Sequence, residues 1–228
     1  MTKVSFSHYP KPFRAAIKIL RDYRTNPDRV NSALSKLRRK SVNIDLYGSC
    51  RSVEKEEILK SGAVWFHTIV GPCFFIGAAV KNKEGIIDRA AAGHFRARFE
   101  PSDLERLLSR ILPIAPDEKV NAFITGSSQR NTIAEALKSI NNITNNFNRI
   151  DLPMQSNTDI WHYPVLRDIN KNNMIISDLG NDREEEIEYR FVYFGVTPED
   201  CMLFSVHRKD EITQRIRIIT PDVGLIDL

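Results

Sequence analysis

The 228-residue sequence lacks the short motifs that most often mark a metal or cofactor site. It has no Cys-x-x-Cys pair, no His-Glu-x-x-His and no EF-hand loop, so a structural metal site is not expected. It also has no Gly-x-Gly-x-x-Gly pattern and no phosphate-binding loop, so nothing in it indicates nucleotide binding. We therefore expect neither a metal nor a cofactor.

Long apolar runs and close cysteine pairs are also missing. No uninterrupted apolar run reaches the roughly 18 residues of a membrane-spanning helix, and charges interrupt the first twenty residues, unlike a secretory leader. The three cysteines, Cys50, Cys73 and Cys201, are widely spaced. This pattern argues against a disulfide framework and favours a reducing compartment.

Positive charge is concentrated at the N-terminus. Residues 1–40 hold eleven Lys and Arg against two Asp, a net charge of +9, whereas the whole chain carries +4. A basic segment can bind an anionic partner such as nucleic acid, phospholipid or an acidic protein. The alternative is a solvated helix face, which we favour because aromatic side chains do not interleave with the charges as base stacking requires. No obligatory nucleic-acid partner is expected.

Apolar periodicity predicts a mixed α+β protein. Helical spacing predicts helices over residues 11–24, 27–40, 52–60, 101–112 and 131–142. Alternating or β-branched runs predict strands over residues 42–48, 63–70, 73–82, 86–99, 120–126, 150–154, 161–169 and 174–179, and three more after the acidic run at 182–188.

Two of these strands form a predicted hairpin that contains a cysteine and a histidine. The turn is Lys83-Glu84-Gly85, and the midpoint between residues 73 and 94 falls within it. Cys73 and His94 should therefore lie nearly opposite each other, unless a bulge shifts the register. The small residues Gly77 to Ala79 and Ala90 to Gly93 would tolerate the close approach of another chain.

A cysteine nucleophile needs a base to remove its proton, a group that orients the base, and donors that face the developing oxyanion. Cys73 follows a Gly-Pro turn that leaves backbone N–H groups available, and His94 is the candidate base. The alternative is that both residues are structural, because lone buried cysteines and histidines are common.

The segment GPCFFIGAAVKNKEGIIDRAAAGHF resembles the CheD family of chemotaxis proteins. In that family Gly-Ser-Cys leads into an apolar strand, a turn, and a returning strand that carries a histidine after small residues. PSDLERLLSRIL, VNAFITGSS, QRNTIAEALKSINN and a late hairpin follow in the family's order. The resemblance covers about residues 63–180, with Pro72 in place of the usual Ser and a longer turn.

The resemblance implies a CheD-like layered sandwich and a glutamine deamidase, related in fold and chemistry to cytotoxic necrotizing factor toxins. Cys73 would attack a glutamine side-chain amide of a target protein, and His94 would be base and then acid. Thr68 is the candidate that would orient His94, with His67 or a backbone carbonyl as the alternatives. Backbone groups of the substrate and oxyanion region would come from Gly71, Pro72, Gly93, Gly126 and Ser127.

Other cysteines fit this chemistry less well. Cys50, in LYGSC, matches Gly-Ser-Cys more closely, but a charged segment follows it instead of an apolar strand. Cys201 and His207 lie on one predicted strand, and a separation of six residues places them about 20 Å apart. We interpret Cys201 and His207 as structural.

The sequence therefore predicts a catalytic core over residues 61–180, a basic helical extension over 1–60 and a β-rich extension over 181–228. The expected function is a cysteine-dependent protein-glutamine deamidase, acting in the bacterial cytoplasm or as an effector or toxin in a host cell. The alternative is an inactive CheD-like binding module that docks through its basic N-terminal arm.

Overall fold

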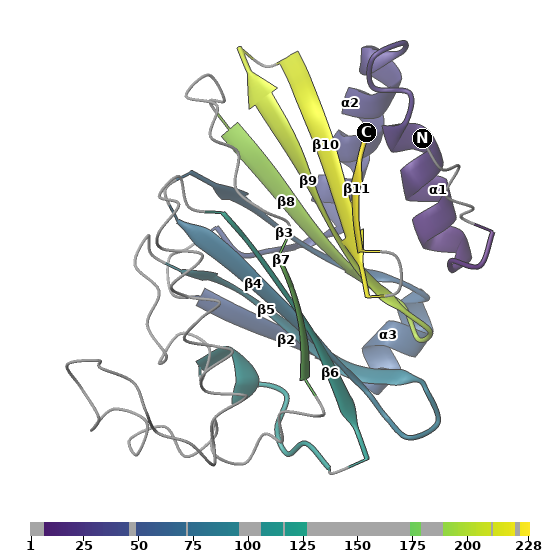
Figure 1. The fold of residues 1–228 in the computed structure, drawn as a ribbon, viewed down its shortest axis with the longest axis vertical. Helices are drawn as coiled ribbons and strands as arrows, with labels where there is room; N and C mark the ends of the chain where they lie inside the picture. The colour runs from purple at the N-terminus through teal and green to yellow at the C-terminus, as the bar shows by residue number, and fades with distance from the viewer. Residues whose placement is uncertain are drawn as a thin grey trace.

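The computed structural model describes residues 7–45, 49–71, 73–95, 106–115, 117–126, 174–178, 189–210, 212–221 and 224–228. These residues form an α+β structure with two β-sheets (Figure 1). The helices are α1 (Lys11–Leu20), α2 (Pro27–Lys40) and α3 (Lys55–Ser61), and residues 106–108 are also helical.

One sheet has six strands in the order β1 (Val42–Asn43), β3 (Val64–Val70), β8 (Tyr189–Val196), β9 (Cys201–Lys209), β10 (Ile212–Thr220) and β11 (Gly224–Asp227). The other has five strands in the order β2 (Ser49–Glu54), β5 (Ile87–Phe95), β4 (Phe74–Lys81), β6 (Lys119–Gly126) and β7 (Met174–Asp178). All neighbouring strands are antiparallel except the parallel pairs β1–β3 and β6–β7.

The six-stranded sheet has a different layer on each face. Figure 1 shows α1 and α2 along its outer face and the five-stranded sheet on its inner side. Strand β3 alternates accordingly, because successive side chains point to opposite faces. Phe66 and Val70 belong to the core between the sheets, and Trp65 belongs to the core beneath the helices. Thr68 therefore points inward, and His67 points toward the helices.

The N-terminal helices are bound to the last strands of the chain. Phe13, Ile17 and Leu20 of α1 are buried in the outer core. The Tyr23 hydroxyl donates to the carbonyl oxygen of Leu228 at 2.9 Å. The basic segment predicted from the sequence is thus a packed helical layer, although the Lys and Arg side chains at the end of α2 are exposed.

The small residues of the β4–β5 hairpin accommodate side chains of this same chain. A Cβ atom at Gly77 would lie 2.8 Å from the ring of Phe194 on the opposite sheet. Ala79 and Ala90 are fully buried in the core between the sheets. The facing aromatic ring of β8 therefore fills the space at Gly77, and packing within this chain explains the lack of a side chain there.

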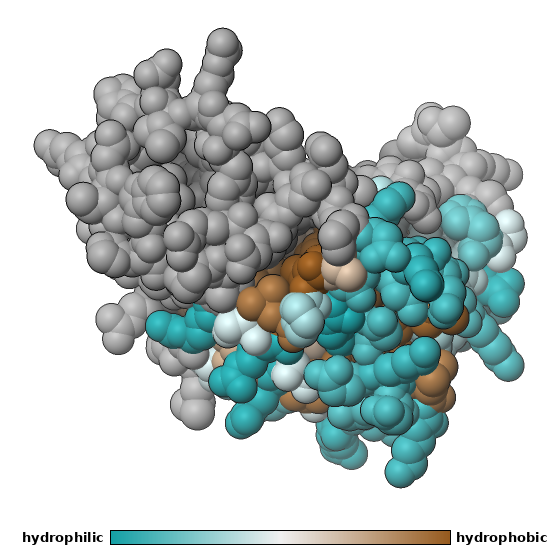
Figure 2. Space-filling model, turned by 90° about the horizontal axis from the view of Figure 1, so that it is seen from below, coloured by the Kyte–Doolittle hydropathy of each residue, from teal (hydrophilic) through white to brown (hydrophobic). Residues whose placement is uncertain are grey.

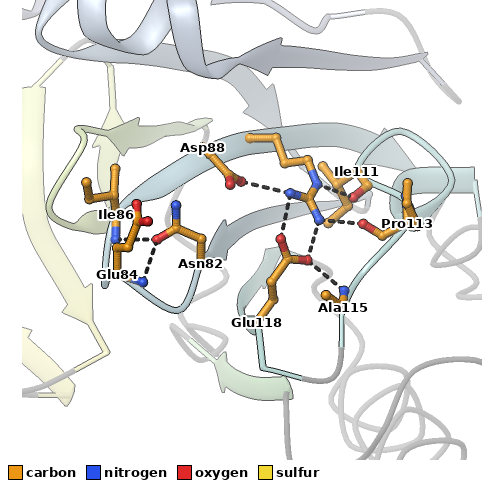
Figure 3. Close-up of polar contacts among 9 residues, drawn as sticks. Asn82, Glu84, Ile86, Asp88, Ile111, Pro113, Ala115 and Glu118 are labelled. Carbon is orange, nitrogen blue, oxygen red and sulfur yellow. Dashed lines mark hydrogen bonds and ion pairs between the residues drawn. The ribbon is translucent and has the colours of Figure 1, made fainter.

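A network around Arg89 holds the segment before β6 against β5 (Figure 3). The guanidinium group donates to the carbonyl oxygens of Ile111 and Pro113, and it pairs with the carboxylates of Asp88 and Glu118. Both oxygens of Glu118 are engaged by this group. Such a forked arrangement fixes direction as well as distance, so it anchors the connection between the two strands.

Most predicted elements that fall on described residues are present. The main correction is at residues 52–60, where a helix was expected, because residues 52–54 belong to β2 and α3 begins at Lys55. Of the predicted strand over 42–48, only residues 42–43 form a strand, and 46–48 lie outside the described residues. The expectations for residues 101–105, 131–142, 150–154, 161–169 and 182–188 also fall outside them.

The predicted segment boundaries at residues 60 and 180 cut across both sheets. Strand β2, from the predicted N-terminal extension, pairs with β5. Strand β8, from the predicted C-terminal extension, pairs with β3 along its full length. Both predicted extensions therefore supply strands to the same two sheets as the predicted core. The division into three segments stays a sequence prediction.

Hydrophilic side chains cover most of the described surface seen in Figure 2, and hydrophobic side chains form smaller areas among them. Large apolar side chains that are exposed within the described residues include Leu59 and Ile212. None of the helices in the described ranges has the length and hydropathy needed to cross a membrane.

Candidate cysteine–histidine site

The register of the β4–β5 hairpin places His94 opposite Phe75. The pairing is offset by two residues from the arrangement predicted by the turn midpoint, and the register shift between Val80 and Lys81 contributes one of the two. Cys73 lies two residues before Phe75, so it shares a face with His94 and is its diagonal neighbour. The sequence predicted that Cys73 and His94 lie nearly opposite each other unless a bulge shifts the register, and the observed pairing is offset from that by two residues. An even offset keeps the two side chains on one face.

The side chains of Cys73, His94 and Thr68 form one chain of contacts between the two sheets. His94 Nε2 lies 2.8 Å from Cys73 Sγ, and His94 Nδ1 lies 3.0 Å from Thr68 Oγ1. Nδ1 also lies 3.2 Å from the carbonyl oxygen of Ile44. The three residues singled out in the sequence thus meet in space, although they come from β3, from β5 and from the start of β4.

The carbonyl of Ile44 determines which ring nitrogen of His94 carries the proton. A carbonyl oxygen can only accept, so the contact at 3.2 Å requires a proton on Nδ1. The Thr68 hydroxyl donates to the same carbonyl at 3.1 Å and so accepts from Nδ1. In the neutral imidazole, Nε2 then presents its lone pair to Cys73 Sγ.

The site is buried, and burial favours a neutral His94. Desolvation lowers the pKa of His94 from its usual value of 6.5, although the Ile44 carbonyl and the charge and backbone of Asp45 offset part of the shift. Cys73 is also buried. A neutral imidazole oriented in this way can remove the thiol proton as the nucleophile attacks.

The turn before Cys73 supplies a further donor. The Gly71 N–H group donates to Cys73 Sγ at 3.4 Å, which stabilises negative charge on the sulfur. Gly71 is exposed, and no atom lies within 4 Å of the position where a Cβ would be. The Gly71 backbone therefore contacts the buried sulfur through its N–H group and is itself exposed at the surface.

The other expected substrate-region residues lie in different positions. Gly126 ends β6 opposite Phe74, the residue after Cys73, so its backbone borders the site. Gly93 faces the other side of the sheet, where a Cβ would lie 2.5 Å from the Phe95 ring and 2.9 Å from Cys50 Sγ. Its lack of a side chain is explained by this packing. Pro72 and Ser127 lie outside the described residues.

The rival residues are separated from this site. Cys50 pairs with Gly93, so its side chain is on the face of β5 opposite to His94. Cys201 is part of the core between the sheets, and His207 Nε2 lies 2.8 Å from the Ser205 hydroxyl. Within the described ranges, no group of three or more His, Cys, Asp or Glu side chains is arranged to hold a metal ion.

The sequence left open whether a backbone carbonyl orients His94, and it did not indicate that Ile44 supplies one. The Ile44 carbonyl is brought to His94 by the parallel pairing of β1 with β3, which the Ile44 N–H continues by donating to the His67 carbonyl at 3.0 Å. No local pattern in the sequence reports such a pairing between backbone groups.

No protein-family model matches the chain, and a search of curated proteins finds no match to it. The geometry of the Cys73–His94–Thr68 contacts therefore carries the functional proposal.

Proposed function

We propose that the protein is a cysteine hydrolase that converts the side-chain amide of a glutamine in a target protein to a carboxylate. The observation that carries this proposal is the 2.8 Å contact of Cys73 Sγ with His94 Nε2, combined with a ring whose Nδ1 donates to Ile44 and Thr68. Such a nucleophile, base and orienting group are the parts that acyl transfer from an amide requires.

In the first step, His94 Nε2 takes the thiol proton while Cys73 Sγ bonds to the amide carbon. The π electrons of the carbonyl move to oxygen and form a tetrahedral intermediate. The intermediate collapses when His94 returns the proton to the amide nitrogen, so ammonia leaves and a thioester remains. The donor at Gly71 stabilises the sulfur before attack.

In the second step, water attacks the thioester carbon and His94 Nε2 accepts a proton from it. The C–S bond breaks, the sulfur recovers its proton, and glutamate is released. One water is consumed and one ammonia produced, with no change of oxidation state. The contacts at Nδ1 keep the same ring nitrogen facing the sulfur in both steps.

The fold supports the family resemblance as a proposal. The Cys-bearing strand, the turn and the His-bearing strand occur in the expected order, and they lie in a two-sheet α+β structure. Thr68 contacts the nitrogen that an orienting residue should contact. We propose by extension a CheD-like sandwich that modifies another protein, in a bacterial cell or in a host cell reached as an effector.

Alkylation by iodoacetamide tests the nucleophile, because the three cysteines differ in exposure. Cys50 is 8% exposed, Cys73 is 2% and Cys201 is 0%. If exposure alone controlled the rate, Cys50 would react first. An activated Cys73 should instead react fastest at pH 7, measured by peptide mass spectrometry. Alkylation of Cys73 no faster than that of Cys50 would overturn the assignment.

Ammonia release from a panel of glutamine-containing peptides and folded helical proteins tests the reaction class. Deamidation should be detected as an amide-to-acid mass change at glutamine, and Cys73→Ser should abolish it. A fast-reacting Cys73 without any ammonia release would favour the alternative of a binding module over a hydrolase.

A further inference from the structure

A cross-strand row of side chains passes beside Cys73 on the inner face of the five-stranded sheet. Phe75 is the register partner of His94 on β5 and of Thr125 on β6. Cys73 precedes Phe75 by two residues, so it is a diagonal neighbour of both His94 and Thr125 on the same face. His94 thus approaches the thiol from one neighbouring strand, and Thr125 flanks it from the other.

The hydroxyl of Thr125 is buried without a partner. Thr125 is 0% exposed, and its Oγ1 makes no hydrogen bond to any residue that the structure describes. A buried hydroxyl without a partner destabilises the folded state, whereas an apolar side chain of the same shape would not. Because the Thr125 hydroxyl lies beside a candidate nucleophile and lacks a hydrogen-bond partner, we expect a bound ligand to supply that partner.

The register separates the Thr125 hydroxyl from the sulfur by the width of a diagonal pair. Diagonal neighbours in an antiparallel pair have Cα atoms about 7–8 Å apart. The long imidazole of His94 spans this distance, with Nε2 2.8 Å from Sγ. The short side chain of Thr125 does not span it, and its Oγ1 makes no hydrogen bond to the sulfur. The fully buried Phe75 lies between His94 and Thr125 in this row.

We propose that the Thr125 hydroxyl donates a hydrogen bond to the carboxamide oxygen of the substrate and stabilises it as it becomes an oxyanion. This role rests on the hydrolase function proposed above and assigns one donor of that reaction. When Sγ bonds to the amide carbon, the carbonyl π electrons move to oxygen and the thiol proton is on His94. A fixed donor in a buried site stabilises that charge strongly.

The test uses an aldehyde that reproduces the oxyanion without a leaving group. The probe is N-acetyl glutamic semialdehyde N-methylamide, in which an aldehyde replaces the glutamine amide. Cys73 Sγ bonds to the aldehyde carbon, and the carbonyl oxygen takes the charge or the proton from His94. Isothermal titration calorimetry measures the dissociation constant for the wild-type chain and for Thr125→Val, Thr125→Ser and Thr213→Val.

Thr213→Val is the matched control. Thr213 Oγ1 is also buried without a hydrogen bond, but it lies on β10 in the six-stranded sheet. The same chemical change at Thr213 should leave aldehyde binding unaltered. Thr125→Val should weaken binding by about 10²-fold, the typical loss of one oxyanion donor, whereas Thr125→Ser should stay close to wild type because it keeps the hydroxyl.

Two further measurements separate this role from a structural one. Alkylation of Cys73 by iodoacetamide forms no oxyanion, so its rate should be the same in Thr125→Val and wild type. The unfolding temperature of Thr125→Val should not fall, because the variant loses an unpaired polar group. A variant that loses aldehyde binding together with alkylation rate or unfolding temperature would show a structural role and overturn the proposal.

The failure of this inference differs from the failure of the proposed function. If the wild-type chain binds the aldehyde and Thr125→Val binds it equally well, Thr125 is not the donor and the hydrolase proposal stands. If the wild-type chain forms no adduct, the hydrolase proposal fails and the role of Thr125 fails with it.

Discussion

Strand β3 separates two histidine environments that are equally buried. On the inner face of β3, Thr68 contacts His94. On the outer face of β3 lies His67, the residue before Thr68 in the sequence. Both histidines are 3% exposed, and desolvation is the main cause that lowers the pKa of each. The partners differ. His94 has a neighbour at both ring nitrogens. Among the described residues, neither nitrogen of His67 makes a well-formed hydrogen bond, although the nearby backbone of Val42 acts to raise its pKa, and the His67 ring stacks on Tyr193.

This contrast shows that burial and a lowered pKa do not by themselves identify a base. A base needs a nitrogen lone pair aimed at an acidic proton and a second nitrogen held by an acceptor. His94 meets both conditions through Cys73 and Ile44. His67 has no acidic proton within hydrogen-bond reach of either nitrogen among the described residues, so we expect the two faces of β3 to respond differently to substitution.

Removal of the nucleophile should have the largest effect on the inner face. Cys73→Ser is expected to lower ammonia release by on the order of 10⁴-fold or more, because loss of a nucleophile removes the covalent route. Cys50→Ser is the matched control, since Cys50 faces the other side of β5. Equal losses in the two variants would contradict the assignment of Cys73.

Removal of the base should have the next largest effect. His94→Gln is expected to lower ammonia release by about 10²–10⁴-fold, the usual range for a general base. Because burial lowers the pKa of His94 below its usual 6.5, the midpoint of the acid limb of the rate should lie below pH 6.5, where Nε2 becomes protonated. A rate–pH profile measures this, and an acid limb centred above pH 6.5 would contradict the proposed neutral base.

The orienting contact should matter less, because His94 Nδ1 has a second acceptor. Thr68→Val removes the hydroxyl and leaves the Ile44 carbonyl at 3.2 Å. One hydrogen bond contributes about 0.5–1.5 kcal/mol, so the loss of rate should be roughly tenfold at most. Thr68→Ser, which keeps the hydroxyl, should recover the rate, and a failure to recover would attribute the loss to packing.

The sequence predicted the parts of this site that depend on local pattern. Alternation and composition predict the strands at residues 63–70 and 73–82 and the turn at Gly85. These elements place Cys73 and His94 on one face of the hairpin. The register itself was not predictable. The shift between Val80 and Lys81 is a backbone irregularity that leaves no mark in the apolar alternation.

Other parts depend on pairings between distant segments. The Ile44 carbonyl reaches His94 through the β1–β3 pair, and Thr125 reaches the site through the β4–β6 pair. Each is a choice of neighbouring strand that is made by the whole sheet and not by a local run of residues. A threonine that ends an apolar strand therefore carries no sign of its role until the strand order is known.

Substitution of His67 should have the smallest effect and should appear only in stability. His67→Phe replaces two ring nitrogens that make no well-formed hydrogen bond within the described residues with apolar atoms next to Tyr193, so ammonia release should be unchanged. Because the pKa of His67 is lowered from 6.5 in the folded chain, the unfolded chain binds the proton first, and wild-type stability falls as the pH drops below 6.5. The variant should lose less free energy of unfolding than wild type between pH 7.5 and 5, measured by urea denaturation. His94 contributes a slope of the same sign, so some loss should remain. An equally steep decline in His67→Phe would mean that His67 is not held neutral on the outer face of β3, and the contrast between its two faces would then rest on hydrogen bonding alone.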